Sequence, residues 1–162
     1  HSVVLFEPQR RLLISADALW ERGFGVVFPE LEGEQAFAEV EATLDVIEQL
    51  QPEWVLPGHG GMFSDVAGAL TVARKRLADF QADPQRHAQY AAKVLLKYKL
   101  LEWQQASCQQ VQDWCASTPL MQQMRQRYFA DQDPVAWVLA LLQALAAARA
   151  VVWEGDQVRN VD

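Results

Sequence analysis

The sequence contains few histidines and cysteines, and few lysines and arginines in its first half. It has three histidines and two cysteines, and no lysine or arginine between Arg22 and Arg74. Residues 1–84 carry 14 acidic and 6 basic side chains, whereas a nucleic-acid surface needs clustered Lys and Arg. The first half of the chain is therefore a poor candidate for binding DNA or RNA.

Long apolar runs are also absent. A membrane-spanning helix needs roughly 20 consecutive apolar residues, but the most apolar stretch, residues 135–150, is alanine-rich and interrupted by Gln143. The first residues also lack the basic leader of a signal peptide. We therefore expect no membrane partner.

The two cysteines, Cys108 and Cys115, are seven residues apart. If both lie on one helix, their Cα atoms are about 10 Å apart, which exceeds the roughly 7 Å limit of a disulfide. We expect two free thiols and, since thiols persist in a reducing compartment, a cytoplasmic location.

Hydrophobic patterning predicts an α/β domain over residues 1–83. Residues 3–6 and 11–15 form a predicted hairpin around a turn, and residues 54–56 form a further strand. Two helices accompany these strands, one before Pro52 and one after a cap at Ser64 or Asp65. Their apolar stripes are Phe37, Val40, Leu44, Ile47 and Leu50 in the first helix, and Val66, Leu70, Ala73, Leu77 and Phe80 in the second.

Residues 84–162 are predicted to form a second, mainly helical domain. One helix carries the stripe Tyr90, Val94, Tyr98 and Leu101, and a cluster of three lysines (Lys93, Lys97 and Lys99) is expected on its solvated face. The next three helices are expected to begin at Ser107, which opens a capping box, and at the pairs Thr118-Pro119 and Asp133-Pro134. The chain ends in a hairpin around Gly155-Asp156, and several helices followed by a β-hairpin resemble a winged helix.

Two apolar, strand-like segments each lead to a side chain of the kind that binds metals. Asp17 follows Leu12-Leu-Ile-Ser-Ala, and His59 follows Trp54-Val-Leu-Pro-Gly. A buried strand holds the residue at its end rigidly, and the glycines around His59 allow a sharp turn. Taken alone, Asp17 is also explained as a cap and His59 as a structural or surface residue. Together they predict one metal site, with both residues as metal ligands.

These segments resemble the C-terminal half of the metallo-β-lactamase superfamily. The hairpin of residues 2–17 is similar to the segment that leads to the family's metal-bridging aspartate, and Leu56-Pro-Gly-His-Gly60 to the segment of its last metal histidine. The resemblance covers residues 2–80, with Ala16 where the family usually has glycine. It implies half of an αββα sandwich and a metal-dependent hydrolase with two metal ions, commonly zinc. The resemblance implies that Asp17 would bridge the ions and His59 would complete one coordination shell, so that both would be catalytic residues.

The resemblance also implies ligands that are not in this sequence. The family's His-x-His-x-Asp-His cluster has no counterpart, and the remaining histidines are His1 and His87. We expect His1 to lie just after the family's third-motif histidine and His87 to lie on the surface, so that neither binds metal. A catalytic zinc needs three protein ligands and an open position. We therefore expect a truncated fragment, shortened deliberately or by proteolysis, that is inactive alone.

For the intact protein the resemblance implies hydrolysis of a small-molecule substrate, and we expect an ester or thioester. The apolar loop of residues 24–28 is predicted to be exposed and to line or cover the substrate pocket, with Phe24 and Phe28 as pocket residues. Packing at a domain or dimer contact explains this loop equally well.

Two alternatives remain open. One is a non-catalytic interaction module that forms a homodimer through the apolar loop or the C-terminal helices, and the other is an RNA-cleaving nuclease of the same fold. DNA binding is not expected, because the helix before the final hairpin, residues 134–148, has no Lys or Arg.

Overall fold

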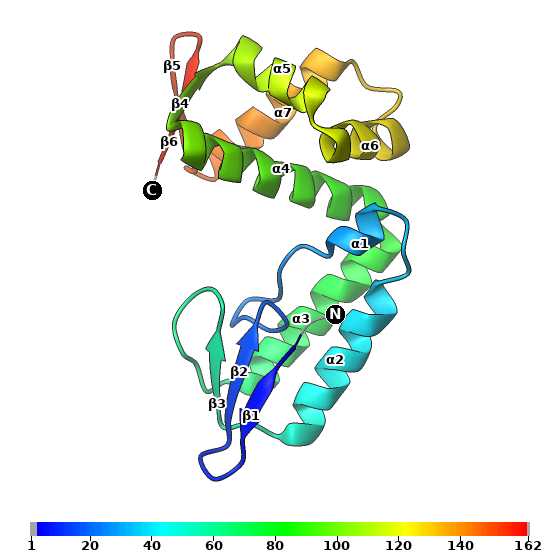
Figure 1. Ribbon diagram of the computed structural model, residues 1–162, viewed down its shortest axis with the longest axis vertical. Helices are drawn as coiled ribbons and strands as arrows, with labels where there is room; N and C mark the ends of the chain where they lie inside the picture. Colours follow the sequence, from blue (N-terminus) through cyan, green and yellow to red (C-terminus); the bar gives the residue numbers. More distant parts are fainter. Residues whose placement is uncertain (1–2, 162) are drawn as a thin grey trace. The chain divides into compact units, whose positions relative to one another are not determined.

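The computed structural model describes residues 3–161 of the chain (Figure 1), so His1 lies outside the described residues. The contacts within the chain divide it into two compact units, one before and one after the junction of Asp83 and Pro84. Each unit contains a three-stranded sheet together with its own helices.

The sheet of the first unit combines a hairpin with a parallel strand. Strand β1 (Leu5–Glu7) is antiparallel to β2 (Leu12–Ala16), and β2 is parallel to β3 (Trp54–Pro57). The predicted hairpin is confirmed, although β1 begins later than expected. Its turn is held by the Glu7 carboxylate, which accepts hydrogen bonds from the backbone N–H groups of Gln9 at 3.1 Å and Arg10 at 2.7 Å.

Helices supply the connection that a parallel pair of strands requires. They are α1 (Phe28–Leu31) and α2 (Phe37–Leu50), whereas α3 (Val66–Ala82) follows β3. Asp65, one of the two predicted caps, accepts a hydrogen bond from the Gly68 N–H at 3.0 Å and so caps α3. Arg74 on α3 joins the two long helices through ion pairs with Asp45 at 2.8 Å and Glu48 at 2.7 Å on α2.

The two faces of this sheet differ in what covers them. Leu13 and Val55 are paired across β2 and β3 and are fully buried, and α2 and α3 lie on one side of the sheet (Figure 1). On the other side, the apolar side chains of three paired residues are exposed: Leu5 by 62%, Ile14 by 42% and Leu56 by 43%. We call these three residues, together with Trp54, the open sheet face.

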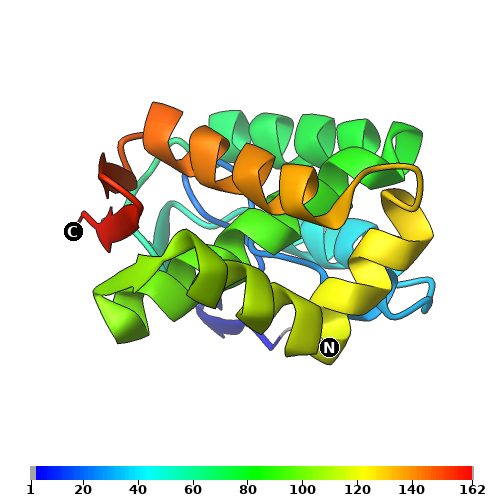
Figure 2. The same ribbon diagram turned by 90° about the horizontal axis from the view of Figure 1, so that it is seen from above.

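The second unit is mainly helical. Its elements are α4 (Pro84–Trp103), β4 (Gln105–Ser107), α5 (Cys108–Ser117), α6 (Pro119–Tyr128), α7 (Pro134–Ala147), β5 (Val151–Glu154) and β6 (Gln157–Asn160). Figure 2 follows α7 (orange) from the loop after α6 (yellow) to the final hairpin (red). The predicted hairpin is confirmed, and the central strand of the sheet is β6, with β4 on one side and β5 on the other.

The predicted helix starts in this unit are confirmed. The side chain of Ser107 accepts from the backbone of Gln110 and completes a capping box at the start of α5. Asp133 accepts from the Ala136 N–H at 2.8 Å at the start of α7. Thr118 makes no such bond to α6, because its hydroxyl donates instead to the carbonyl of Trp114 at 2.7 Å.

The predicted buried stripe of α4 is wrong. Tyr98 is 56% exposed and Leu101 is 38% exposed, whereas His87, predicted to lie on the surface, is 1% exposed. The buried side of the helix is made by small residues and leucines: Ala88, Ala91, Ala92, Leu96 and Leu100. Helices α6 and α7 pack against α4, and alanines allow this close approach, which large residues at the same positions would prevent.

Two further features of this unit were not predicted from the sequence: strand β4 and the hydrogen bonds of Lys97. A strand of three residues is too short to show alternation. Lys97 was predicted to lie on a solvated helix face, but the residue is half-buried. It donates to the carbonyls of Ala150 at 3.0 Å and Val161 at 2.7 Å and to the side chain of Asn160. Through these hydrogen bonds, Lys97 on α4 holds both ends of the final hairpin.

Helix α7 contributes its large apolar residues to the core of its own unit. The buried ones are Trp137, Val138, Leu141, Leu142 and Leu145. None of the helices within residues 3–161 combines the length and the hydrophobicity that crossing a bilayer requires.

The environment of the two free thiols on α5 predicts how each reacts. Burial raises the pKa of Cys115 to about 12, and burial together with the charge of Asp156 raises the pKa of Cys108. Since the thiolate is the reactive form, we expect the half-buried Cys108 to react slowly with a disulfide reagent at pH 8 and Cys115 to react only on unfolding. Rapid labelling of the folded Cys108→Ser variant would contradict this, and labelling in denaturant is the control.

Candidate functional site

Parallel pairing brings the two predicted ligands to the same edge of the sheet. Ala16 at the end of β2 is paired with Pro57 at the end of β3, and the next residues along each strand lead to Asp17 and His59. The distance between Asp17 Oδ1 and His59 Nε2 is 3.7 Å. Both side chains are exposed, by 66% and 58% respectively. The structure therefore places the two residues together, at an edge that is open to a ligand.

A bend at the end of β2 directs Asp17 out of the sheet. The pairing of β2 with β3 is irregular between Ile14 and Ala16, and Ala16 has a φ of 46°. This is the left-handed region, where a residue with a Cβ is strained and glycine is not. The buried hydroxyl of Ser15 donates to the carbonyl of Leu19 at 2.6 Å and holds the turn that follows.

Gly58 allows the two strand ends to approach each other. Its N–H donates to the Ala16 carbonyl at 2.8 Å. A Cβ added at Gly58 would lie 3.0 Å from Asp17 Oδ1 and 3.1 Å from the carbonyl group of Ala16. Only a residue without a side chain fits between these atoms at their present positions.

Trp20 contacts His59 and is a site residue that the sequence interpretation missed. The two rings meet edge to face, with centroids 5.1 Å apart and planes at 78°. The indole N–H of Trp20 donates to the Ala16 carbonyl at 3.2 Å, and its backbone pairs with Gly23. An aromatic residue three positions after Asp17 was the available signal, but a loop sequence does not reveal where such a ring points.

The geometry of Asp17 and His59 fits two ligands of one zinc ion. A carboxylate oxygen and an imidazole nitrogen are both zinc ligands, and in a tetrahedral site two such atoms lie about 3.4 Å apart. The observed 3.7 Å is close to this value. Within residues 3–161, no group of three or more His, Cys, Asp or Glu side chains could hold a metal ion. The described residues therefore bring together two side chains of the types that bind zinc, without a third beside them.

The loop after Asp17 is less exposed than predicted. Phe24 is 2% exposed and Val27 is 9% exposed, because both pack inside the first unit. The Phe24 ring lies edge to face with Phe80 and under the guanidinium of Arg76. Phe28 is 36% exposed, as the first residue of α1.

A small cavity of about 130 Å³ lies beside Asp17. Phe24 is among its lining residues, and Phe28 is not. The other side of this cavity is formed by α2, through Glu39, Val40 and Thr43. Of the two predicted pocket residues, Phe24 therefore shares the lining of this cavity with Asp17, and Phe28 does not.

We compared the chain with protein families, curated proteins and solved structures, and a similarity was found among the solved structures. No protein-family model matches the chain, and no curated protein matches it. Among solved structures, the chain is similar to a metallo-beta-lactamase family protein from Thermus thermophilus, with 20% sequence identity and a TM-score of 0.38. The match covers 98% of this chain and 44% of that protein, so the chain spans less than half of that protein's length.

The position of Gly58 makes a testable prediction about the site. We expect Gly58→Ala to displace Asp17 and the end of β2 and to lower the free energy of unfolding by about 1–2 kcal/mol. Gly61→Ala is the matched control, because a Cβ at Gly61 meets no atom within 4 Å, and we expect it to change stability by less than about 0.5 kcal/mol. Urea unfolding measures both, and equal stabilities of the two variants would contradict the prediction.

Proposed function

We propose that Asp17 and His59 are two protein ligands of the metal centre of a metal-dependent hydrolase with the metallo-β-lactamase fold. The remaining ligands would come from a part of the protein outside residues 3–161. The observation that carries this proposal is the 3.7 Å approach of the two side chains at the open edge of the sheet.

The open sheet face supports the proposal that the first unit is half of an αββα sandwich. Its side chains are apolar and 42–62% exposed, and an apolar sheet face normally packs against another layer. In a sandwich, the second sheet lies about 10 Å away and buries such a row.

The second unit supports the proposal of a winged-helix-like domain that does not bind DNA. Its helices precede a β-hairpin, as expected for such a domain. The helix before the hairpin, α7, has no Lys or Arg and buries Trp137, Val138 and Leu141 among its own unit's residues. A recognition helix needs polar or basic side chains directed at the grooves of DNA.

In the proposed reaction, the residues of this chain bind and orient the metal. A bound zinc would lower the pKa of a coordinated water to about 7 and polarise a carbonyl or phosphoryl group of the substrate. The Asp17 carboxylate supplies a negatively charged ligand, and the His59 imidazole supplies a neutral one. The Trp20 ring, which meets the His59 ring edge to face, would help to hold the imidazole in place. A second zinc ion, an ester or thioester substrate and a cytoplasmic location are further parts of this proposal.

A non-catalytic interaction module is the second candidate function. It is favoured by the same open sheet face, since an exposed apolar surface marks a contact site. An RNA nuclease has less support, because the first unit has no Lys or Arg between Arg22 and Arg74 with which to bind a phosphate backbone.

Metal titration tests the ligand assignment. We expect the 162-residue chain to bind Zn²⁺ weakly, and Asp17→Ala and His59→Ala each to lower the affinity at least about tenfold, since each removes a ligand. NMR of the His59 ring during Zn²⁺ addition measures this for the wild type and Asp17→Ala, and calorimetry measures it for all variants. Asp131→Ala, which removes an exposed carboxylate in the second unit, is the control. Equal affinities of all four proteins would show that the assignment is wrong.

Hydrolysis by a longer protein that contains this chain tests the enzyme proposal itself. We expect Asp17→Ala and His59→Ala to lower both its metal content and its rate on esters or thioesters. The 162-residue chain alone should show no turnover after Zn²⁺ addition, because it lacks a third ligand in residues 3–161. Unchanged metal content and rate in both variants would contradict the proposal, as would turnover by the chain alone.

The open sheet face makes a separate prediction for the 162-residue chain. We expect Ile14→Lys to change the free energy of unfolding by less than about 0.5 kcal/mol and to reduce self-association in light scattering. Leu13→Lys, on the buried face of the same strand, should unfold the first unit, because it buries a charge. An Ile14→Lys variant as unstable as Leu13→Lys would show that the face is not open.

A further inference from the structure

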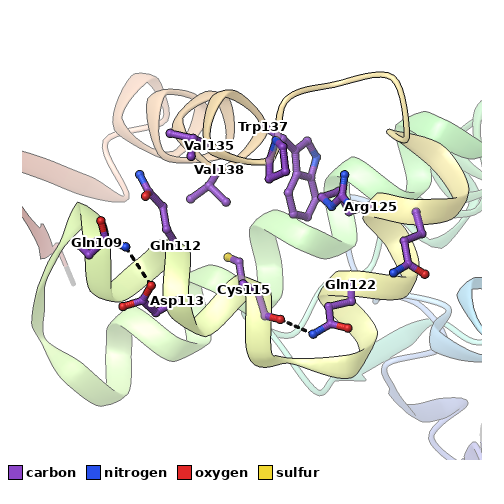
Figure 3. Close-up of a pocket in the computed structure, with 12 residues that line it drawn as sticks. Gln109, Gln112, Asp113, Cys115, Gln122, Arg125, Val135, Trp137 and Val138 are labelled. Carbon is purple, nitrogen blue, oxygen red and sulfur yellow. Dashed lines mark hydrogen bonds between the residues drawn. The ribbon is translucent and has the colours of Figure 1, made fainter.

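A pocket of about 490 Å³ lies among α5, α6 and α7 of the second unit (Figure 3). This volume is within the range of about 300–1,000 Å³ that is typical of small-molecule sites. All of its lining residues belong to this one unit. Asp17 and His59 are therefore not among the residues that line the pocket.

The walls of the pocket combine apolar and polar groups. Val135, Trp137 and Val138 of α7 and Cys115 of α5 form the apolar part, as Figure 3 shows. The polar groups include the amides of Gln112 and Gln122. Such a lining fits a ligand with an apolar body and a small number of polar atoms.

Arg125 is the cation among the lining residues. It is half-buried, and within residues 3–161 its guanidinium makes no ion pair or side-chain hydrogen bond. Helix α6 has no acidic residue to neutralise it. A guanidinium presents five N–H donors in a planar arrangement that matches a carboxylate. The positive charge of Arg125 therefore favours a ligand that carries an anionic group.

Asp113 is the anion among the lining residues, and it lies on α5. Its carboxylate accepts a hydrogen bond from the Gln109 amide at 2.9 Å (Figure 3). A negatively charged ligand group would be repelled by Asp113 and attracted by Arg125. The two charges therefore favour one orientation of an anionic ligand, with its anionic group on the α6 side.

Trp137 also lines this pocket, and among the described residues its indole N–H lacks a hydrogen-bond acceptor. The side chain is 3% exposed, and its Nε1 is the buried side-chain nitrogen without a hydrogen-bond partner in the described part of the chain. Most buried polar side-chain atoms have a partner. An acceptor atom brought by a ligand, with a small adjustment of the indole, would satisfy this donor.

We propose that this pocket binds a small amphipathic carboxylate, whose anionic group pairs with Arg125 and whose apolar body packs on Val135, Val138 and Trp137. This site acts in addition to the proposed metal centre and does not depend on it.

Titration of the 162-residue chain with 4-phenylbutyrate tests the proposal, with 4-phenyl-1-butanol as the neutral analogue. NMR signals of the Trp137 indole N–H and the Arg125 side chain report on the pocket. We expect saturable shifts with a dissociation constant on the order of 1 mM or lower for the carboxylate. Arg125→Gln should lower this affinity about tenfold and leave the weaker binding of the alcohol unchanged. Arg127→Gln, on the same helix but outside the pocket lining, should bind like the wild type.

The result that overturns the proposal is an absence of saturable shifts at Trp137. Equal losses of affinity in the Arg125 and Arg127 variants would also overturn it, because general charge would then explain binding. If Arg125→Gln does not fold, the comparison of the two ligands on the wild-type chain decides: equal affinity for the carboxylate and the alcohol contradicts a role for Arg125.

Discussion

The parallel pairing of β2 with β3 is the constraint on which the candidate metal site depends. It aligns the ends of two strands that are far apart in sequence, so that Asp17 and His59 lie 3.7 Å apart. The close approach costs backbone strain at Ala16, whose φ is 46°, and it requires the absence of a side chain at Gly58. Strain of this kind persists only where the surrounding structure holds it, and here the buried hydroxyl of Ser15 and the Trp20 indole do so.

The two units use their apolar residues in different ways. The first unit buries one side of its sheet and leaves apolar residues exposed on the other, as expected of a layer that packs against a further layer. The second unit buries the apolar face of α7 in its own core but keeps a pocket next to it, with Arg125 and Trp137 among the lining. The first unit therefore exposes apolar side chains on one side of its sheet, and the second unit contains a pocket lined by both apolar and charged side chains.

The local elements were predictable because their signals are local. The hairpin before Asp17, the stripe of α2 and the capping residues Ser107 and Asp133 are properties of short windows of sequence, and the structure confirms each of them. The burial of His87, the exposure of Tyr98 and the pairing of the three-residue strand β4 were not predictable in this way. Each depends on which side of an element meets a partner that is distant in sequence.

For the candidate site, the two side-chain types and their places at strand ends could be predicted from sequence alone, because an apolar run followed by Asp or His is a pattern of neighbouring residues. The three-dimensional fold was needed to show that these two side chains meet, that Trp20 contacts His59 and that Phe24 is buried against Phe80. It also decided that helices α5, α6 and α7 enclose a pocket. The physical reason is that strand register and helix packing set distances between residues that no local pattern relates.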